Sequence, residues 1–165
     1  MSFYKDYFEN IARKQASIRH EENNKECFFY IEDWNNTQPI AQKLARQAGN
    51  AILVLEEYDD EVNDSNADNN RVSIYGAFVV IKHVSDSRGD KDTAKEDCRR
   101  IAKSIVHKLK WDALNGVLNT QKIVCKMDSR GFSVGPVFNN YWGWRYSFAW
   151  TAPENIALNP ADWLP

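Results

Sequence analysis

Seven aromatic side chains lie within thirteen residues near the end of the sequence, in the stretch FNNYWGWRYSFAW from Phe138 to Trp150. Rings presented to solvent can stack on sugars or unpaired bases, because both offer a flat face. The same rings facing inward would form a core, and rings on a subunit surface would form an interface. The pattern therefore has three interpretations: core packing, a ligand platform or a subunit interface.

A second feature is the acidic segment DDEVNDSNADNN, residues 59–70, which holds five acids and no base. Hard cations such as Ca²⁺ take several carboxylate oxygens, but this spacing matches no EF-hand loop and lacks its glycine turn. We interpret the segment as an exposed connection, long for a hairpin, or as a contact loop. Asp59, Asp60 and Glu61 are its candidates for an interface.

The other residues that could do chemistry are scattered along the chain. The histidines lie on three different predicted elements, with no pair at metal-ligand spacing. The three cysteines are far apart among apolar neighbours, which is typical of core residues in a reducing compartment. The tripeptide RGD, residues 88–90, fits the turn and cap that begin a helix. The residues concerned are His20, His83, His107, Cys27, Cys98 and Cys125.

No phosphate-binding loop, nucleophile elbow or HExxH motif occurs in the sequence. We therefore predict no catalytic, cofactor-binding or metal-binding residues and no cofactor. Titratable groups from several elements can still meet in space, so an enzyme remains an alternative.

Length and composition limit the classes of protein further. A chain of 165 residues is the size of one domain and can bury roughly 70% of its unfolded surface. A net charge of −2 disfavours a general polyanion binder. No signal peptide or membrane-length apolar run is present, so we expect no membrane partner and a protein of the cytoplasm or of particles assembled there.

The elements that must position these residues follow from periodicity and turn signals. An aromatic amphipathic helix is expected in the first seventeen residues, and a second helix from Gln38 to Ala48. The long central helix is expected between Ser85 and Gly116. Strands are predicted at 26–34, 51–58 and 71–84 and from Gln121, Gly131 and Gly143, with turns DSRG and NNYWG between the last three.

This order predicts one α+β domain over residues 1–165, with a mostly antiparallel sheet packed with the N-terminal helix and the long central helix. Residues 154–165 are expected to be a C-terminal tail. Within the last strand, alternation places Trp144, Tyr146, Phe148 and Trp150 on one face. That row is expected to pack on a helix, which leaves Tyr141 and Trp142, in the preceding turn, as candidates for exposure.

The order of elements resembles that of the tail-terminator and neck (tail-completion) proteins of tailed bacteriophages. The resemblance runs over Phe3 to Pro153 and rests on an aromatic N-terminal helix, a long hairpin, a long helix and strands ending in GFSVGPVFNNYWGWRYSFAWTAP. It concerns element order, not a motif. The helix at 38–48 and the tail after Pro153 depart from the simplest version, which leaves the position within the neck or tail open.

The resemblance implies a non-enzymatic virion protein, assembled in the host cytoplasm as a ring between the capsid portal and the tail. Its implied partners are copies of itself and neighbouring portal, neck or tail proteins, with non-specific DNA in the lumen as a further partner. The candidate interface residues are Asp59, Asp60, Glu61, Tyr141, Trp142 and Trp163. The alternative is a small cytoplasmic binding module or enzyme whose aromatic turn binds a sugar or single-stranded nucleic acid.

Overall fold

Two long strands, β4 (Arg71–His83) and β7 (Tyr141–Pro153), form the centre of the sheet. They pair antiparallel along all thirteen residues, from Arg71 opposite Pro153 to His83 opposite Tyr141. Every other strand attaches directly or indirectly to this pair. The register of β4 against β7 therefore sets where each remaining element lies.

The computed structural model describes residues 2–34, 38–44, 49–63, 70–85, 88–126, 130–138, 140–154 and 161. Its helices are α1 (Ser2–Lys14), α2 (Gln38–Leu44), α3 (Arg88–Asn115), α4 (Val117–Thr120) and the short 3₁₀ turn η1 (Glu22–Asn24). Its other strands are β1 (Phe28–Ile31), β2 (Ile52–Glu56), β3 (Asp59–Asn63), β5 (Val124–Lys126) and β6 (Phe132–Val137).

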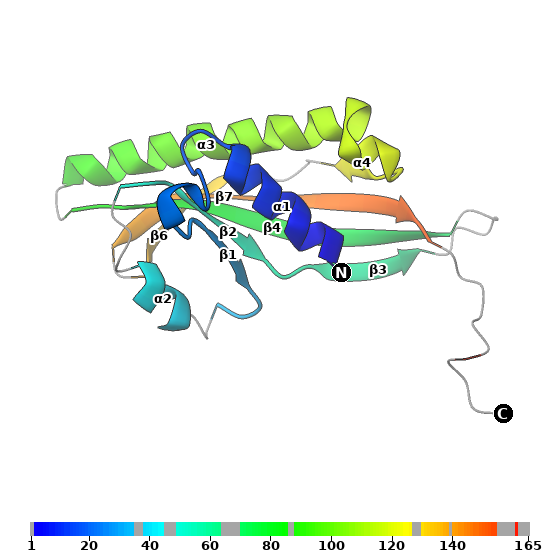
Figure 1. Cartoon of the computed structure of the whole chain (residues 1–165), viewed down its shortest axis with the longest axis horizontal. Coiled ribbons are helices and arrows are strands. Elements are labelled where there is room, and N and C mark those ends of the chain that lie inside the picture. The colour runs from blue at the N-terminus through cyan, green and yellow to red at the C-terminus, as the bar shows by residue number, and fades with distance from the viewer. Residues whose placement is uncertain are drawn as a thin grey trace.

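The sheet has the order β1-β2-β4-β7-β5, with β3 beside β4 and β6 beside β7. Of the strand pairs that the structure describes, β1 and β2 run parallel and the others are antiparallel. Strand β3 occupies the half of β4 that begins at Arg71, whereas β6 occupies the half of β7 that begins at Tyr141. These two strands therefore lie on opposite edges of the sheet and toward opposite ends of it (Figure 1).

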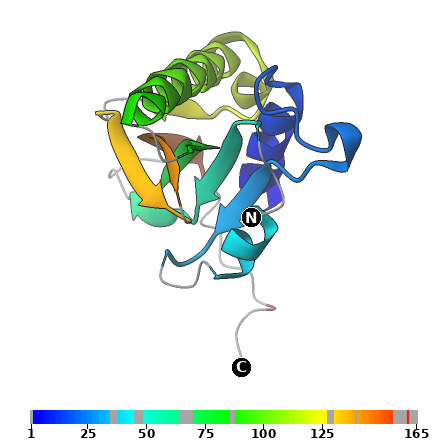
Figure 2. The ribbon, with the colours of Figure 1, turned by 90° about the vertical axis from the view of Figure 1, so that its left-hand side faces the viewer.

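One face of the sheet is covered by α1 and α3, and the other is covered in part by α2 (Figures 1 and 2). Under α1 and α3 lies the larger core, where Tyr4 and Phe8 of α1 meet Phe148 and Trp150 of β7. Under α2 lies a smaller core that includes Leu44, Val79 and Tyr141. Successive residues of a strand face opposite sides of the sheet. The even-numbered residues of β7 therefore face the larger core, and the odd-numbered residues face the side of α2.

The α+β class, the mostly antiparallel sheet, the N-terminal helix and the long central helix are confirmed. The aromatic row of β7 also packs as predicted, since Phe148 and Trp150 are buried in the larger core and Trp144 and Tyr146 pack against it. Gly116 ends α3 as expected, and its backbone lies so close to Asp112 that a Cβ would collide there.

Two predictions at strand boundaries are wrong. Residues 59–63 are a strand, not part of an irregular connection, because β4 extends far enough to offer them a ladder and an edge strand tolerates charged residues. Tyr141 and Trp142 are not in a turn, because β7 begins at Tyr141 and pairs there with His83. The helix α4 has no counterpart among the predicted elements.

No helix among the described residues is long and apolar enough to cross a membrane. Two predicted features lie outside the described residues: the end of the second helix at 45–48 and most of the tail after Glu154.

Gly76 in β4 provides a test of the packing between α1 and the sheet. A Cβ at this position would collide with the Tyr4 hydroxyl and lie 2.8 Å from Cζ of Phe148. Tyr4 cannot move aside freely, because its hydroxyl donates a 3.0 Å hydrogen bond to the Glu56 carbonyl. We expect Gly76→Ala to lower the free energy of unfolding by about 1–3 kcal/mol in urea denaturation.

The control for this measurement is Val62→Ala on the edge strand β3, where the side chain is exposed. This change should alter the free energy of unfolding by less than about 0.5 kcal/mol. Equal stabilities of the Gly76→Ala variant and the wild type would contradict the close packing of Tyr4 on β4.

Candidate interaction surfaces

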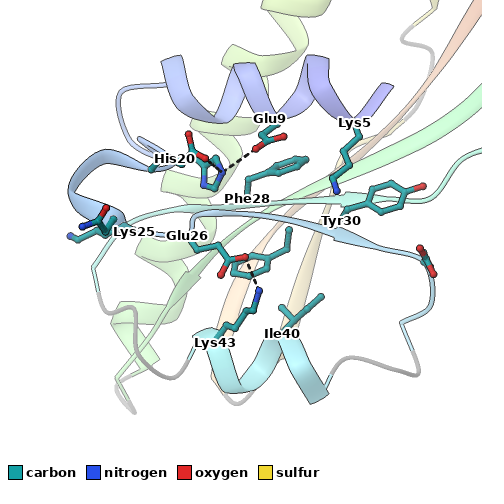
Figure 3. A pocket seen from close by; sticks show the side chains of 13 residues that line it. Lys5, Glu9, His20, Lys25, Glu26, Phe28, Tyr30, Ile40 and Lys43 are labelled. Carbon is teal, nitrogen blue, oxygen red and sulfur yellow. Dashed lines mark hydrogen bonds and ion pairs between the residues drawn. The ribbon is translucent and has the colours of Figure 1, made fainter. Parts of the chain in front are cut away.

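A groove of about 800 Å³ lies between α1, η1, β1 and α2. Figure 3 shows its charged side chains in pairs: His20 lies beside Glu9, and Lys43 lies beside Glu26 at 2.8 Å. Lys5 points toward the ring of Tyr30, with its Nζ 5.9 Å from the ring centroid. The groove therefore combines an apolar floor with rim charges that neutralise one another.

Glu9, His20 and Glu21 place three potential metal ligands within 4.8 Å of one another. The hydrogen bonds argue against a metal here. The backbone N–H of Cys27 donates to Nδ1 of His20 at 3.1 Å, so the neutral ring carries its proton on Nε2, the atom that faces the two carboxylates. A protonated nitrogen has no lone pair for a cation.

Arg13 occupies the same carboxylates, with Nη2 2.7 Å from Glu9 and Nε 2.7 Å from Glu21. The hydrogen bond from Arg13 holds the pKa of Glu21 below its ordinary value. These ion pairs therefore hold the segment around Glu21 against α1, and this geometry favours a structural role for the cluster.

A second groove, of about 580 Å³, runs between α1 and the C-terminal half of α3. Its walls include Phe3, Ile11 and Trp111, and its floor holds a buried polar pair. There the Tyr7 hydroxyl donates to Asp112 at 2.7 Å, and Lys108 donates to the other carboxylate oxygen at 2.7 Å. The buried carboxylate is thus compensated inside the chain, and the groove offers mainly apolar surface.

Large apolar side chains stand exposed beside this groove. Trp111 is 56% exposed, Leu114 73% and Val117 43%, and they lie on the last turns of α3 and on α4. We call these three residues the apolar patch. Adjacent exposed apolar groups of this size typically mark a surface that binds another protein.

Sequence reasoning missed the apolar patch, although a signal for it was present. Trp111 falls outside the helical stripe of Cys98, Ile105 and Leu109 that enters the core. A tryptophan out of phase with the buried stripe of its helix must face solvent or a partner.

The acidic edge is the strand β3, with its exposed carboxylates Asp59, Asp60 and Glu61. None of the three lies within ion-pair distance of a basic residue in the described structure; Glu61 accepts a 3.0 Å hydrogen bond from Tyr75. Among the described strands, β3 pairs with β4 alone, so its outer edge carries backbone groups available for a further strand.

The basic seam lies at the opposite edge, where α3 meets the start of β7. Lys95 and Lys91 place Nζ 4.7 and 5.6 Å from the ring centroid of Trp142, and Arg99 places Cζ 5.2 Å from that of Trp144. The indole N–H groups of Trp142 and Trp144 and the Nε of Arg99 are buried without a hydrogen-bond acceptor. We define the seam by these five residues, which supply cations and donors but few acceptors.

The structure separates the predicted interface residues. Asp59, Asp60 and Glu61 are exposed on one edge, while Trp142 is half-buried in the basic seam on the other. Tyr141 is only 3% exposed, and its hydroxyl donates to the Leu44 carbonyl at 2.9 Å. Tyr141 therefore belongs to the smaller core, because position 141 is an odd residue of β7 on the face covered by α2. Trp163 lies outside the described residues.

The remaining sequence candidates occupy ordinary structural positions. Cys27 and Cys98 are buried in the larger core, and burial raises the pKa of Cys98 to about 12. Cys125 is half-buried, with a pKa raised by burial to about 11. Arg88, Gly89 and Asp90 form the first turn of α3, and Asp90 accepts a hydrogen bond from Ser85.

All three histidines belong to the described residues, and none forms a hydrogen bond with a hydroxyl or thiol side chain there. His20 accepts from the Cys27 backbone, and His83 meets Tyr141 edge-on. The arrangement that activates a serine or cysteine nucleophile is therefore not present around these histidines.

No family model matches the chain, and no curated protein is significantly similar to it in sequence.

Because α1 buries two tyrosines, we expect the free energy of unfolding to change with pH in the alkaline range. Burial, followed by the charges of nearby Tyr30 and Glu56, raises the pKa of Tyr4 well above its ordinary value. Burial and the hydrogen bond to Asp112 do the same for Tyr7. The folded state thus keeps two protons that the unfolded state releases above a pH of about 10, so the free energy of unfolding should fall as pH rises beyond that point.

Tyr7→Phe tests this dependence. The variant should be less stable than the wild type at pH 8, by about 1–3 kcal/mol, because Asp112 loses a buried donor. Between pH 10 and 11, its stability should fall by about 1 kcal/mol less than that of the wild type, because one tyrosine fewer loses its proton on unfolding. Urea denaturation at each pH measures both effects, and equal slopes would contradict the assignment.

Proposed function

We propose that this chain is a non-enzymatic structural subunit that assembles with copies of itself into a ring, at the neck or tail of a tailed bacteriophage virion. The observation that carries the proposal is the apolar patch of Trp111, Leu114 and Val117 beside an open apolar groove. A single chain leaves this surface in water, and burying it against another protein would be favourable by about 25 cal/mol per Å² of apolar area.

The scaffold beneath the patch suits such a role. The long pair β4–β7 and the helix α3 are locked together by the larger core, so the surfaces at the sheet edges and at the end of α3 are held on one rigid body. Closed rings use two different surfaces per subunit, and the described structure has several that differ in charge and polarity. The order of elements that resembles tail-terminator and neck proteins supports the virion location.

The ligand platform is less well supported. Tyr141 is buried, and the ring of Trp142 lies under two lysine side chains. The aromatic turn on which that alternative rests is therefore a strand that packs against both cores.

Size-exclusion chromatography with light scattering tests the proposal. The purified chain, of 19.1 kDa, should elute as a discrete oligomer whose mass is a multiple of the monomer mass, and negative-stain electron microscopy should show rings with a central opening. A monomer at all concentrations, with tryptophan fluorescence that changes on adding sugars or oligonucleotides, would favour the binding module instead.

The double variant Trp111→Ser/Leu114→Ser tests the apolar patch. Because both side chains are exposed in the single chain, the thermal midpoint of the monomer should stay within about 2–4 °C of the wild type. The concentration needed for assembly should rise at least about tenfold, since interface tryptophans carry a large share of binding energy. The matched control is Trp34→Ser, which removes an exposed tryptophan stacked on Phe138 and should leave assembly unchanged.

A further inference from the structure

The acidic edge and the basic seam carry opposite charge and cannot meet within one chain. Strand β3 pairs with β4 on the side away from β7, and the seam lies on the far side of β7, where β6 pairs. The two surfaces also lie toward opposite ends of the sheet, as Figure 1 shows for β3 and β6. Any pairing between the two surfaces must therefore join two molecules.

We propose that the acidic edge of one copy docks beside the basic seam of the next copy, which gives a heterologous, head-to-tail contact. This inference rests on the proposed function and specifies which surfaces of the subunit meet. It places the acidic edge of one subunit beside Lys91, Lys95 and Arg99 of its neighbour, with Asp60 on the face that carries α3 and with Asp59 and Glu61 on the other face of the same strand.

The charges on both sides are available for such pairing. Among the described residues, neither Lys91 nor Lys95 forms an ion pair, and each instead lies over Trp142. Arg99 has a weak 3.3 Å contact with Glu96. The acidic edge supplies three exposed carboxylates, none with a basic partner among the described residues. Opposite charges arranged this way favour the correct pairing and speed association.

The pairing of β3 with β4 also directs side chains toward the seam. Asp60 lies opposite Ile74 and Val62 opposite Val72, and both β4 residues belong to the core beneath α1 and α3. Directly opposed residues share a face, so Asp60 and Val62 project on the side of the sheet that carries α3. When two sheets meet edge to edge with their helices on the same side, these residues face the basic seam of the neighbouring α3.

Apolar groups accompany the charges on both surfaces. Val62 is 61% exposed and Tyr75 46% exposed at the acidic edge, whereas the exposed Phe132 and the half-buried Trp142 lie at the opposite edge. An apolar centre with a charged rim is the usual composition of a specific protein interface. A small metal ion or other simple cation would satisfy the carboxylates but would leave these apolar side chains in water.

Charge reversal with rescue tests the contact. The acidic-edge variant is Asp60→Lys/Glu61→Lys, and the seam variant is Lys91→Glu/Lys95→Glu. Each alone sets like charges against each other, so the concentration needed for assembly at low salt should rise at least about tenfold. A 1:1 mixture of the two variants should assemble again, because each altered surface then meets its complement, and a chain that carries all four changes should also assemble.

The matched control is Lys25→Glu/Lys122→Glu, which makes the same charge change as the seam variant on exposed residues outside both surfaces and should assemble like the wild type. Circular dichroism should give the wild-type spectrum for each variant, which checks that each one is folded. A wild-type chain that stays monomeric would overturn the proposed function and this contact together. A wild-type oligomer that both reversals leave intact, or a mixture that fails to assemble, would overturn the contact alone and leave the proposed function standing.

Discussion

The antiparallel ladder between β4 and β7 is the interaction on which the rest of the structure depends. Its thirteen paired residues fix which side chains of both strands face α1 and α3 and which face α2. A slip of one residue would send Phe148 and Trp150 to the wrong face and bring odd-numbered residues such as Arg145 into the larger core. The two cores on either side of the sheet therefore hold the register in place.

The same ladder determines the surfaces. Because β4 and β7 are longer than their neighbours, each has room for two partners on its outer side: β2 and β3 along β4, and β6 and β5 along β7. The acidic strand β3 and the seam beside β6 end up on opposite edges for this reason. The apolar patch lies at a third place, where α3 ends at Asn115 and Gly116 connects it to α4. One rigid body thus presents three surfaces of different chemistry, which suits a subunit that touches several neighbours.

Much of the fold could be predicted from the sequence. The alternation of Trp144, Tyr146, Phe148 and Trp150 identifies the inward face of β7, because strand geometry leaves no other choice. The buried apolar face of α3 and the end of that helix before Gly116 could be predicted from local spacing in the same way. The strand boundaries were harder to predict. Residues 59–63 have poor strand propensity, and they form a strand because β4 is long enough to pair with them. The candidate site was harder still to predict, because Tyr141 lies in the turn-like stretch NNYWG of the sequence but is buried under α2.

The sequence by itself determined the α+β class, the position of the long helix and the inward row of aromatic residues, because these follow from local periodicity and from the cost of exposing large rings. Only the tertiary structure decided that Arg145 forms a bidentate ion pair with Glu56, 89 residues away, and that Cys27 fixes the proton of His20 on Nε2. It also decided that the acidic edge and the basic seam lie on opposite edges. Such facts depend on which strands pair, and pairing is set by contacts between residues distant in sequence, which local spacing does not encode.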